Sequence, residues 1–357
     1  MKGWAGSATA WTLTETDSIK ETRLVTSQTI WMTVLAMGVS LLAASSVSAQ
    51  SQLGSGAGSV TVTETPIDGF PHSVLYLVPN ERPRPVVVIL GGAEGGNGAG
   101  SRFGPILARL GYAAVGLTYY SPDWGDFAPP PEFPEVPGSF IDIRIDQLEE
   151  LRDEFGVPGV DVQRFGLFSG SKGSEFALIA ATRYPWISSV VAYTPSDLVW
   201  EGWGLEMLDA EGTRSSFSFD GEPLAFMPYR GFVKGLEAGP DADLRAIHEN
   251  GREDHPELEE SARIPLEDFR GALMLVAGER DAQWNSAGMA RNIQETRAAA
   301  GLTTEMLIYP EAGHNIAGGQ AEPIDDPRSG GTPEADANAR IDAWPRVLAF
   351  LERTLNP

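Results

Sequence analysis

The stretch FGLFSGSKGS, residues 165–174, decides the fold of this chain. An apolar run ends there in small residues and a helical pattern begins, which is typical of a strand, a sharp turn and a helix. Ser171 lies at the apex, with the small residues Ser169 and Gly173 two positions before and after it. A serine so placed has a strained backbone and an exposed hydroxyl. Although Ser169 replaces the first glycine of G-x-S-x-G, we predict a nucleophile at Ser171; the alternative is a turn without chemistry.

A serine nucleophile needs a base that takes its proton, and four histidines compete for that role. In a triad of this type the order along the chain is nucleophile, acid and histidine, each after a strand. His72 comes too early, and His248 and His255 lie in a polar, acidic stretch with no strand before them. His314 follows a strand-like run at residues 305–310. We therefore predict that His314 is the base.

The acid of such a triad should follow another strand between these two residues. Residues 271–278 form the strongest apolar run there, and Glu279-Arg280-Asp281 comes directly after it. A carboxylate at this position holds the imidazole tautomer and stabilises the imidazolium. We predict Asp281, with Glu279 as the nearer alternative and Asp197 as the more distant one.

Negative charge that develops on a substrate oxygen needs backbone N–H donors. One donor should be Lys172, the residue after the predicted nucleophile. The other should come from GGAEGG, residues 91–96, which follows the apolar run at residues 86–90. We predict Ala93 or Glu94 there. A phosphate-binding loop is the competing interpretation, but the G-x-x-x-x-G-K-[ST] spacing is absent.

The rest of the chain alternates between strands and helices, which predicts an α/β fold with a mostly parallel sheet. Early strands are expected at residues 59–64 and 73–78. Buried parallel strands are expected at residues 86–90, 113–118, 164–168, 189–193, 273–277 and 305–309. Helices are expected within residues 141–155, 174–184, 285–300 and 332–354.

Two segments interrupt this alternation. Residues 121–138 are rich in Pro, Trp and Phe, and residues 197–262 form a long insertion with many aromatic residues after the sixth expected strand. We expect the insertion to cover the nucleophile as a cap, with Tyr120, Trp124 and Trp284 in contact with substrate. The aromatic residues could equally serve only to pack the cap on the core.

Five stretches carry a family resemblance: residues 90–96, 116–120, 166–174, 264–284 and 312–314. They resemble the catalytic domain of the acyl-CoA thioesterase / bile acid-CoA:amino acid N-acyltransferase family, within the dienelactone-hydrolase-like α/β-hydrolases. The resemblance implies an α/β-hydrolase fold, with Ser171, Asp281 and His314 as nucleophile, acid and base and no cofactor. Because members that conjugate amino acids tend to carry cysteine, the serine favours hydrolysis of acyl esters or thioesters. Acyl transfer to an amine or alcohol, and a non-catalytic binding role, are the alternatives.

Length and composition fit one such domain in residues 50–357, with 42% hydrophobic residues and a net charge of −23. This charge opposes binding to nucleic acid, to anionic membranes and to a polyanion such as CoA. The absence of cysteine excludes thiolate metal sites. Asp325 and Asp326 in the loop at residues 318–331 could bind calcium, but we expect a solvated loop and no metal.

The N-terminal region predicts export. Residues 30–47 are mostly apolar, and Val47-Ser48-Ala49 has the small-x-small form of a cleavage site. We therefore expect residues 1–49 to be a leader with a cleaved signal peptide. The protein would then be periplasmic or secreted, without stable membrane association; an uncleaved anchor at residues 30–47 is the alternative.

Overall fold

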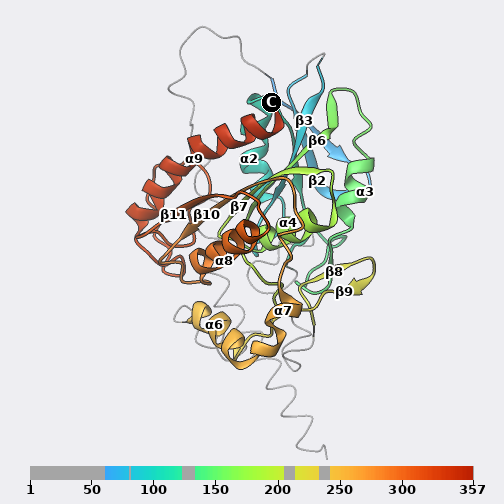
Figure 1. Cartoon of the computed structure of the whole chain (residues 1–357). Coiled ribbons are helices and arrows are strands. Elements are labelled where there is room, and N and C mark those ends of the chain that lie inside the picture. The colour runs from blue at the N-terminus through green and yellow to red at the C-terminus, as the bar shows by residue number, and fades with distance from the viewer. Residues whose placement is uncertain (1–60, 80–81, 123–132, 205–213, 233–241, 357) are drawn as a thin grey trace, which may run out of the picture.

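The computed structural model describes residues 61–79, 82–122, 133–204, 214–232 and 242–356. A sheet of eight strands runs through it in the order β1-β2-β4-β3-β6-β7-β10-β11 (Figure 1). From β4 to β11 neighbouring strands are parallel, whereas β2 is antiparallel to both β1 and β4. The strands are β1 (Thr63–Ile67), β2 (Phe70–Leu77), β3 (Arg84–Leu90), β4 (Ala113–Leu117), β6 (Val160–Gly170), β7 (Ile187–Tyr193), β10 (Ala272–Gly278) and β11 (Glu305–Tyr309).

Helices cover both faces of this sheet. Along β3, Val86 and Val88 pack in one apolar cluster and Val87 and Ile89 in another, because successive side chains of a strand point to opposite faces. The first cluster is closed by α3 (Gln147–Asp153), α4 (Lys172–Arg183) and α8 (Ser286–Ala299). The second is closed by α2 (Gly98–Arg109) and α9 (Pro333–Leu355). Burial on both faces explains why the inner strands read as continuous apolar runs.

The sequence predicted the six parallel strands to within a few residues. The predicted starts of α8 and α9 are confirmed by their N-terminal caps. The Asn285 side chain accepts a hydrogen bond from the Gly288 N–H at the start of α8. The Thr332 hydroxyl accepts one from the Ala335 N–H at the start of α9, where Pro333 takes the first helical position. Both caps satisfy N–H groups that a helix leaves without internal partners.

Two expectations were wrong. The first strand begins at Thr63, and residues 61–62 before it are not in a strand; residues 59–60 lie outside the described residues. The apolar stripe at residues 141–155 is helical only in α3, because Ile143–Arg144 (β5) pairs with Phe217–Phe219 (β8), beside Glu222–Pro223 (β9). This pairing with a segment more than seventy positions away outweighs the local helical preference.

The insertion at residues 197–262 follows β7 and has an apolar cluster of its own. It contains α6 (Leu244–Asp254), the short 3₁₀ helix η3 (Pro256–Leu258) and α7 (Glu259–Ala262), drawn below the sheet in Figure 1. Trp284 and Met289 of the main domain join this cluster and connect the insertion to the sheet. Its other buried members are Leu198, Trp200, Met227, Tyr229, Phe232, Ile247 and Ala262. Within the described ranges, no helix combines the length and apolar character needed to cross a bilayer.

Candidate active site

The predicted site residues follow four strands that end at one edge of the sheet. Ser171 follows β6, and the loop with Gly92 follows its neighbour β3. Asp281 follows β10 and His314 follows β11, which pair with one another. Because these strands are parallel, their carboxyl ends bring the four segments to the same side of the sheet.

The turn at Ser171 is strained, as the sequence predicted. Its backbone has φ 54° and ψ −127°, a region that residues other than glycine rarely adopt. The Ser171 N–H donates to the Tyr193 carbonyl oxygen at 3.0 Å, which ties the turn to the end of β7. At Gly173 a Cβ atom would lie 2.3 Å from the Gly91 carbonyl oxygen. The close approach of α4 to the end of β3 therefore requires a glycine two residues after Ser171.

His314 and Asp281 form a buried pair. The His314 Nδ1 atom lies 3.0 and 2.9 Å from the two Asp281 carboxylate oxygens. Asp281 is fully buried and also accepts hydrogen bonds from the Gln283 N–H and the Ser286 hydroxyl, at 2.9 and 2.6 Å. Because a carboxylate only accepts, His314 carries its proton on Nδ1 and presents Nε2 as a base.

Two opposing effects act on the pKa of His314. Burial lowers it, whereas the charge of Asp281 and the hydrogen bond to it raise it, with smaller contributions from Asp326 and Glu94. The net result is a pKa above the ordinary value of 6.5. The charge of Asp281 and the hydrogen bond to it thus outweigh the effect of burial on the pKa of His314.

The two alternative acids, Asp197 and Glu279, bind to other side chains. Asp197 accepts hydrogen bonds from the Arg252 guanidinium at 2.9 and 3.2 Å and from the Asn292 side chain at 2.7 Å. Glu279 forms an ion pair with Arg291 near the surface. Both carboxylates stabilise neighbouring helices, and neither is the partner of the histidine at this edge.

The other histidines have other partners than Asp281. His72 on β2 is 3.2 Å from the Glu135 carboxylate, and His255 is exposed and 3.4 Å from Glu257. His248 is buried in the insertion, where its Nδ1 atom bonds to the backbone of α6. Chain order had set aside His72, and the absence of a preceding strand had set aside His248 and His255.

The loop after β3 lies against Ser171. A Cβ atom at Gly92 would be 2.9 Å from the Ser171 Cβ atom and 2.8 Å from the Glu94 carboxylate. The Gly92 N–H donates to that carboxylate at 3.0 Å, which sequence reasoning missed. Within the described part of the chain, the N–H groups of Ala93 and Glu94 have no acceptor, and Lys172 has the orphan N–H of a first helical residue. All three predicted donors therefore remain candidates for an oxyanion hole.

The side chain of Lys172 has a separate structural role that the sequence did not indicate. Its Nζ atom is buried and donates to Glu175 at 2.6 Å and to the Ser216 hydroxyl at 2.8 Å. Glu175 in turn accepts from the Trp200 N–H at 2.9 Å. Burial lowers the pKa of Lys172 and raises that of Glu175, while their mutual attraction opposes both shifts. Because Ser216 and Trp200 belong to the insertion, this pair fastens it to the helix that follows Ser171.

Loss of one charge from this pair should be costly. We expect Lys172→Met to reduce the free energy of unfolding by about 3–5 kcal/mol, because Glu175 would be left buried and unpaired. Denaturant unfolding at neutral pH measures this loss. The double variant Lys172→Met/Glu175→Gln should recover most of it, since the neutral amide that replaces the carboxylate can still accept from the Trp200 N–H. A loss under about 1 kcal/mol in the single variant would contradict a buried ion pair.

The three residues expected to contact substrate have different outcomes. Trp284 is 3% exposed and its ring centroid lies 6.0 Å from that of His314. Tyr120 is buried against Phe140, and its carbonyl oxygen accepts from the Gly96 N–H at 2.8 Å, so it borders the loop after β3. Trp124 lies outside the described residues. Both residues therefore lie beside the candidate site. Tyr120 follows β4 and Trp284 follows β10, and these strands lie on opposite sides of β6 in the sheet.

The loop that carries His314 is supported by residues that sequence reasoning missed. The His314 N–H donates to the Ser329 carbonyl oxygen at 2.8 Å. The Asp336 carboxylate accepts from the Gly313 N–H and the Ser329 hydroxyl, both at 2.6 Å. Burial raises the pKa of Asp336. An acidic residue in the first turn of a helix that begins with Thr-Pro was the one signal available in the sequence.

The loop at residues 318–331 was expected to be solvated, but part of it packs beside the histidine. Gly330 forms a β-bridge with Asp281. Asp326, one of the two possible calcium ligands, accepts from the Asn315 side chain at 2.9 Å. Among the residues that the structure describes, no group of three or more acidic or histidine side chains is arranged to hold a metal ion.

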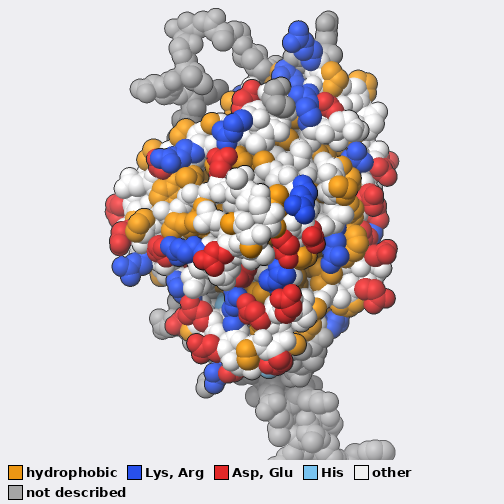
Figure 2. All heavy atoms as spheres, in the orientation of Figure 1, with side chains coloured by type: hydrophobic (Ala, Val, Ile, Leu, Met, Phe, Trp, Pro, Cys, Tyr) orange, Lys and Arg blue, Asp and Glu red, His pale blue; other side chains and the backbone are white. Residues whose placement is uncertain are grey.

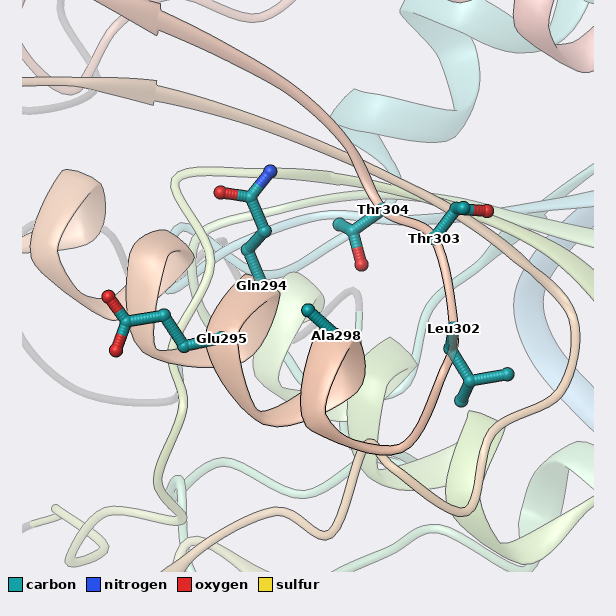
Figure 3. A pocket seen from close by; sticks show the side chains of 6 residues that line it. All are labelled: Gln294, Glu295, Ala298, Leu302, Thr303 and Thr304. Atoms are coloured by element: carbon teal, nitrogen blue, oxygen red, sulfur yellow. The ribbon is translucent and has the colours of Figure 1, made fainter.

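A pocket elsewhere on the surface lies at the wrong end of the sheet for this chemistry. Figure 3 shows its side chains, which come from the last turns of α8 and from the loop that leads into β11. That loop meets the amino end of β11, whereas the candidate site lies at the carboxyl ends. The pocket is lined by Gln294, Glu295, Ala298, Leu302, Thr303 and Thr304.

Solved structures support the fold. A crystal structure of a protein assigned as a dienelactone hydrolase from Klebsiella pneumoniae superposes with a TM-score of 0.50 at 17% identity, covering 82% of this chain and 98% of that one. At this identity the likeness concerns the fold alone. With the strand order above, it confirms the predicted α/β-hydrolase fold.

Curated relatives point the same way. The chain is 27% identical to mouse acyl-coenzyme A thioesterase 6 over 312 residues, covering 81% of this chain and 64% of the relative. It is 26% identical to rat mitochondrial acyl-coenzyme A thioesterase 2 over 300 residues, covering 81% and 59%. The chain thus spans less than two thirds of the length of these relatives.

The family described as BAAT / Acyl-CoA thioester hydrolase C terminal matches residues 155–357, which is more than half of the chain. The matched region contains Ser171, Asp281 and His314 together with the insertion. The resemblance predicted from the sequence is therefore confirmed, and this chain belongs to the BAAT / acyl-CoA thioester hydrolase C-terminal family.

Proposed function

We propose that this protein is a serine hydrolase that cleaves acyl esters or thioesters through an acyl-enzyme on Ser171. The observation that carries the proposal is the buried pair of His314 and Asp281 at the sheet edge where the strained Ser171 turn ends β6. General-base activation of serine requires an imidazole held by a carboxylate, and here such an imidazole lies at the sheet edge where the Ser171 turn also lies.

In the proposed mechanism His314 Nε2 takes the Ser171 proton as the oxygen attacks the acyl carbon. The developing oxyanion would be stabilised by the N–H of Lys172 and by that of Ala93 or Glu94. His314 then returns the proton to the leaving alcohol or thiol, whose bond to the acyl group breaks. Water then attacks the acyl carbon while His314 takes its proton. His314 returns that proton to the Ser171 oxygen as the acyl–enzyme bond breaks and the acid is released.

The surface charge of the protein affects which leaving groups it can bind. On the face drawn in Figure 2, acidic and basic side chains are interspersed. Arginines of the insertion are paired with carboxylates, as in Arg230 with Asp254 at 3.0 Å and Arg245 with Glu249 at 2.9 Å. Together with the net charge of −23, these pairs favour leaving groups less anionic than CoA.

A fluorophosphonate probe tests the reaction class on the full chain. We expect stoichiometric labelling that disappears in Ser171→Ala but persists in Ser174→Ala, whose hydroxyl instead bonds to the Tyr193 carbonyl oxygen. A panel of short and long p-nitrophenyl esters beside acyl-CoA thioesters would then identify the leaving group. Absence of labelling would support a non-catalytic binding protein, and products formed with a candidate amine in preference to water would support acyl transfer.

The pH profile should have a single acid limb set by His314. Only the neutral imidazole can accept the serine proton, so kcat/KM should fall about tenfold per pH unit below the pKa of His314. Since Asp281 raises that pKa, the midpoint of the limb should lie above 6.5. The measurement is kcat/KM against pH at constant ionic strength. A midpoint below 6.5 would show that burial outweighs the carboxylate.

Export is also proposed. The leader at residues 1–49 lies outside the described residues, and the proposal rests on the apolar run and the Val47-Ser48-Ala49 site. Expression of the full chain in a bacterial host should yield a periplasmic or secreted form that begins at Gln50, as read by N-terminal sequencing. Recovery of uncut chain in the membrane fraction would instead support an anchor.

A further inference from the structure

His248 and Trp284 each have a ring nitrogen without a hydrogen-bond partner in the described ranges, and the Trp284 ring lies near the rings of both His248 and His314. The His248 Nδ1 atom lies 2.7 Å from the Leu244 carbonyl oxygen, which can only accept, so Nδ1 carries the proton. The Nε2 atom is then a hydrogen-bond acceptor on the side of the ring away from the α6 backbone. In the described ranges it has no donor, although His248 is only 7% exposed.

The imidazole of His248 is neutral at ordinary pH. Burial lowers its pKa to about 4, against a smaller opposite effect of the bond to Leu244. The charges of Lys172, Asp281 and His314 also act on His248. A residue from the insertion therefore lies within electrostatic reach of the candidate triad and offers it an uncharged acceptor.

Trp284 supplies the complementary donor. Its indole Nε1–H is buried and has no acceptor within the part of the chain that the structure describes. The ring centroid lies 5.5 Å from that of His248, nearly perpendicular to it, and 6.0 Å from that of His314. A buried N–H without a partner is unfavourable, so a ligand atom that accepts from it would bind more tightly.

Aromatic rings pack against the His248 imidazole. The His248 ring packs edge-on against Trp200 and Tyr229, at centroid distances of 4.6 and 5.0 Å. Trp200 cannot share in polar recognition, because its own Nε1–H donates to the Ser196 hydroxyl at 2.9 Å. Trp200 therefore contributes aromatic surface to the environment of His248 and no free donor.

We propose that His248 Nε2 and Trp284 Nε1 form a subsite that binds a hydroxyl group of the substrate beside His314. A hydroxyl is the simplest group whose single oxygen both donates and accepts, which matches this pair. The inference rests on the proposed hydrolase function and narrows its substrate class to hydroxylated esters or thioesters. The hydroxyl could belong to the acyl chain or to the alcohol that leaves.

Binding to the full-chain Ser171→Ala variant tests this without turnover. In the acyl arm, calorimetry compares 4-nitrophenyl 3-hydroxybutanoate with 4-nitrophenyl butanoate. In the alcohol arm it compares 2,3-dihydroxypropyl butanoate with propyl butanoate. We expect the hydroxylated ester to bind about tenfold more tightly in one arm, which identifies the source of the hydroxyl.

Second substitutions in that background assign the preference to the two atoms. Trp284→Phe and His248→Phe should each remove most of it, while His248→Gln, which keeps an acceptor, should retain part. Trp203→Phe is the matched control, because its buried Nε1–H also lacks an acceptor among the described residues but its ring packs on Phe140 and Phe232. Thermal melts report folding, and Trp284→Phe suffices if His248→Phe does not fold.

Equal affinity for both members of each pair, absence of measurable binding, or a preference that survives Trp284→Phe would overturn the subsite. Failure of the proposed function would look different. In that case Ser171 would not be labelled by a fluorophosphonate and the wild-type chain would not turn over any of the four esters. The binding preference is measured without turnover, so it is read independently of that result.

Discussion

Ser171→Ala should lower kcat for ester hydrolysis by about 10⁶-fold and abolish acyl-enzyme formation. Without the hydroxyl, the imidazole of His314 has no proton to take and the acyl group has no oxygen to join. Losses of this order follow removal of the nucleophile in comparable triads, and the residual rate comes from binding and oxyanion donors. Burst kinetics with a p-nitrophenyl ester measure both effects.

A glycine variant separates this loss from the strain of the turn. Since Ser171 has φ 54°, a Cβ atom is strained there whether it belongs to Ser or Ala. Ser171→Gly should therefore be as inactive as Ser171→Ala but more stable by about 1 kcal/mol in unfolding. Turnover within tenfold of wild type in either variant would exclude Ser171 as the nucleophile.

Asp281→Asn should reduce kcat by about 10⁴-fold while leaving substrate binding nearly unchanged. The Asp281 carboxylate accepts from the His314 Nδ1 and so keeps Nε2 free to act as the base. An amide offers an N–H on one side, which permits the wrong imidazole tautomer and removes the charge that stabilises the imidazolium. Steady-state kinetics would show the loss in kcat rather than in KM.

Glu279→Gln is the matched control, because Glu279 lies two residues earlier and pairs with Arg291 rather than with a histidine. We expect its kcat within threefold of wild type. Asp281 is buried with several donors, so Asp281→Asn also needs a melting curve to show that it folds. Comparable losses of kcat in both variants would mean that Asp281 is not the acid of a triad.

The features that could be predicted from the sequence are those that local pattern controls. Short apolar runs that end in small or polar residues identified the parallel strands, and the residues just after them include Ser171, Asp281 and His314. The helix caps at Asn285 and Thr332 were likewise visible, since a cap depends on neighbours three residues away. The resemblance of five stretches to known members identified the family, which the match over residues 155–357 confirms.

Contacts between distant segments could not be predicted in this way. The apolar stripe at residues 141–155 has helical spacing, but Ile143 and Arg144 within that range pair with β8. Glu94 was considered only for its backbone N–H, yet its carboxylate accepts a hydrogen bond from the Gly92 N–H beside Ser171. Lys172 was considered only for its backbone, and its buried partners Glu175 and Ser216 come from two different parts of the chain.

The amino-acid order alone predicted the α/β class, most strand ends and the positions of Ser171 and His314 after their strands, because each depends on spacing along the chain. Only the folded arrangement decided which carboxylate meets His314, how the insertion is held to the core and that His248 and Trp284 lie near the same imidazole. Those outcomes depend on which side chains meet after the sheet has formed, and burial then sets their protonation and hydrogen bonding.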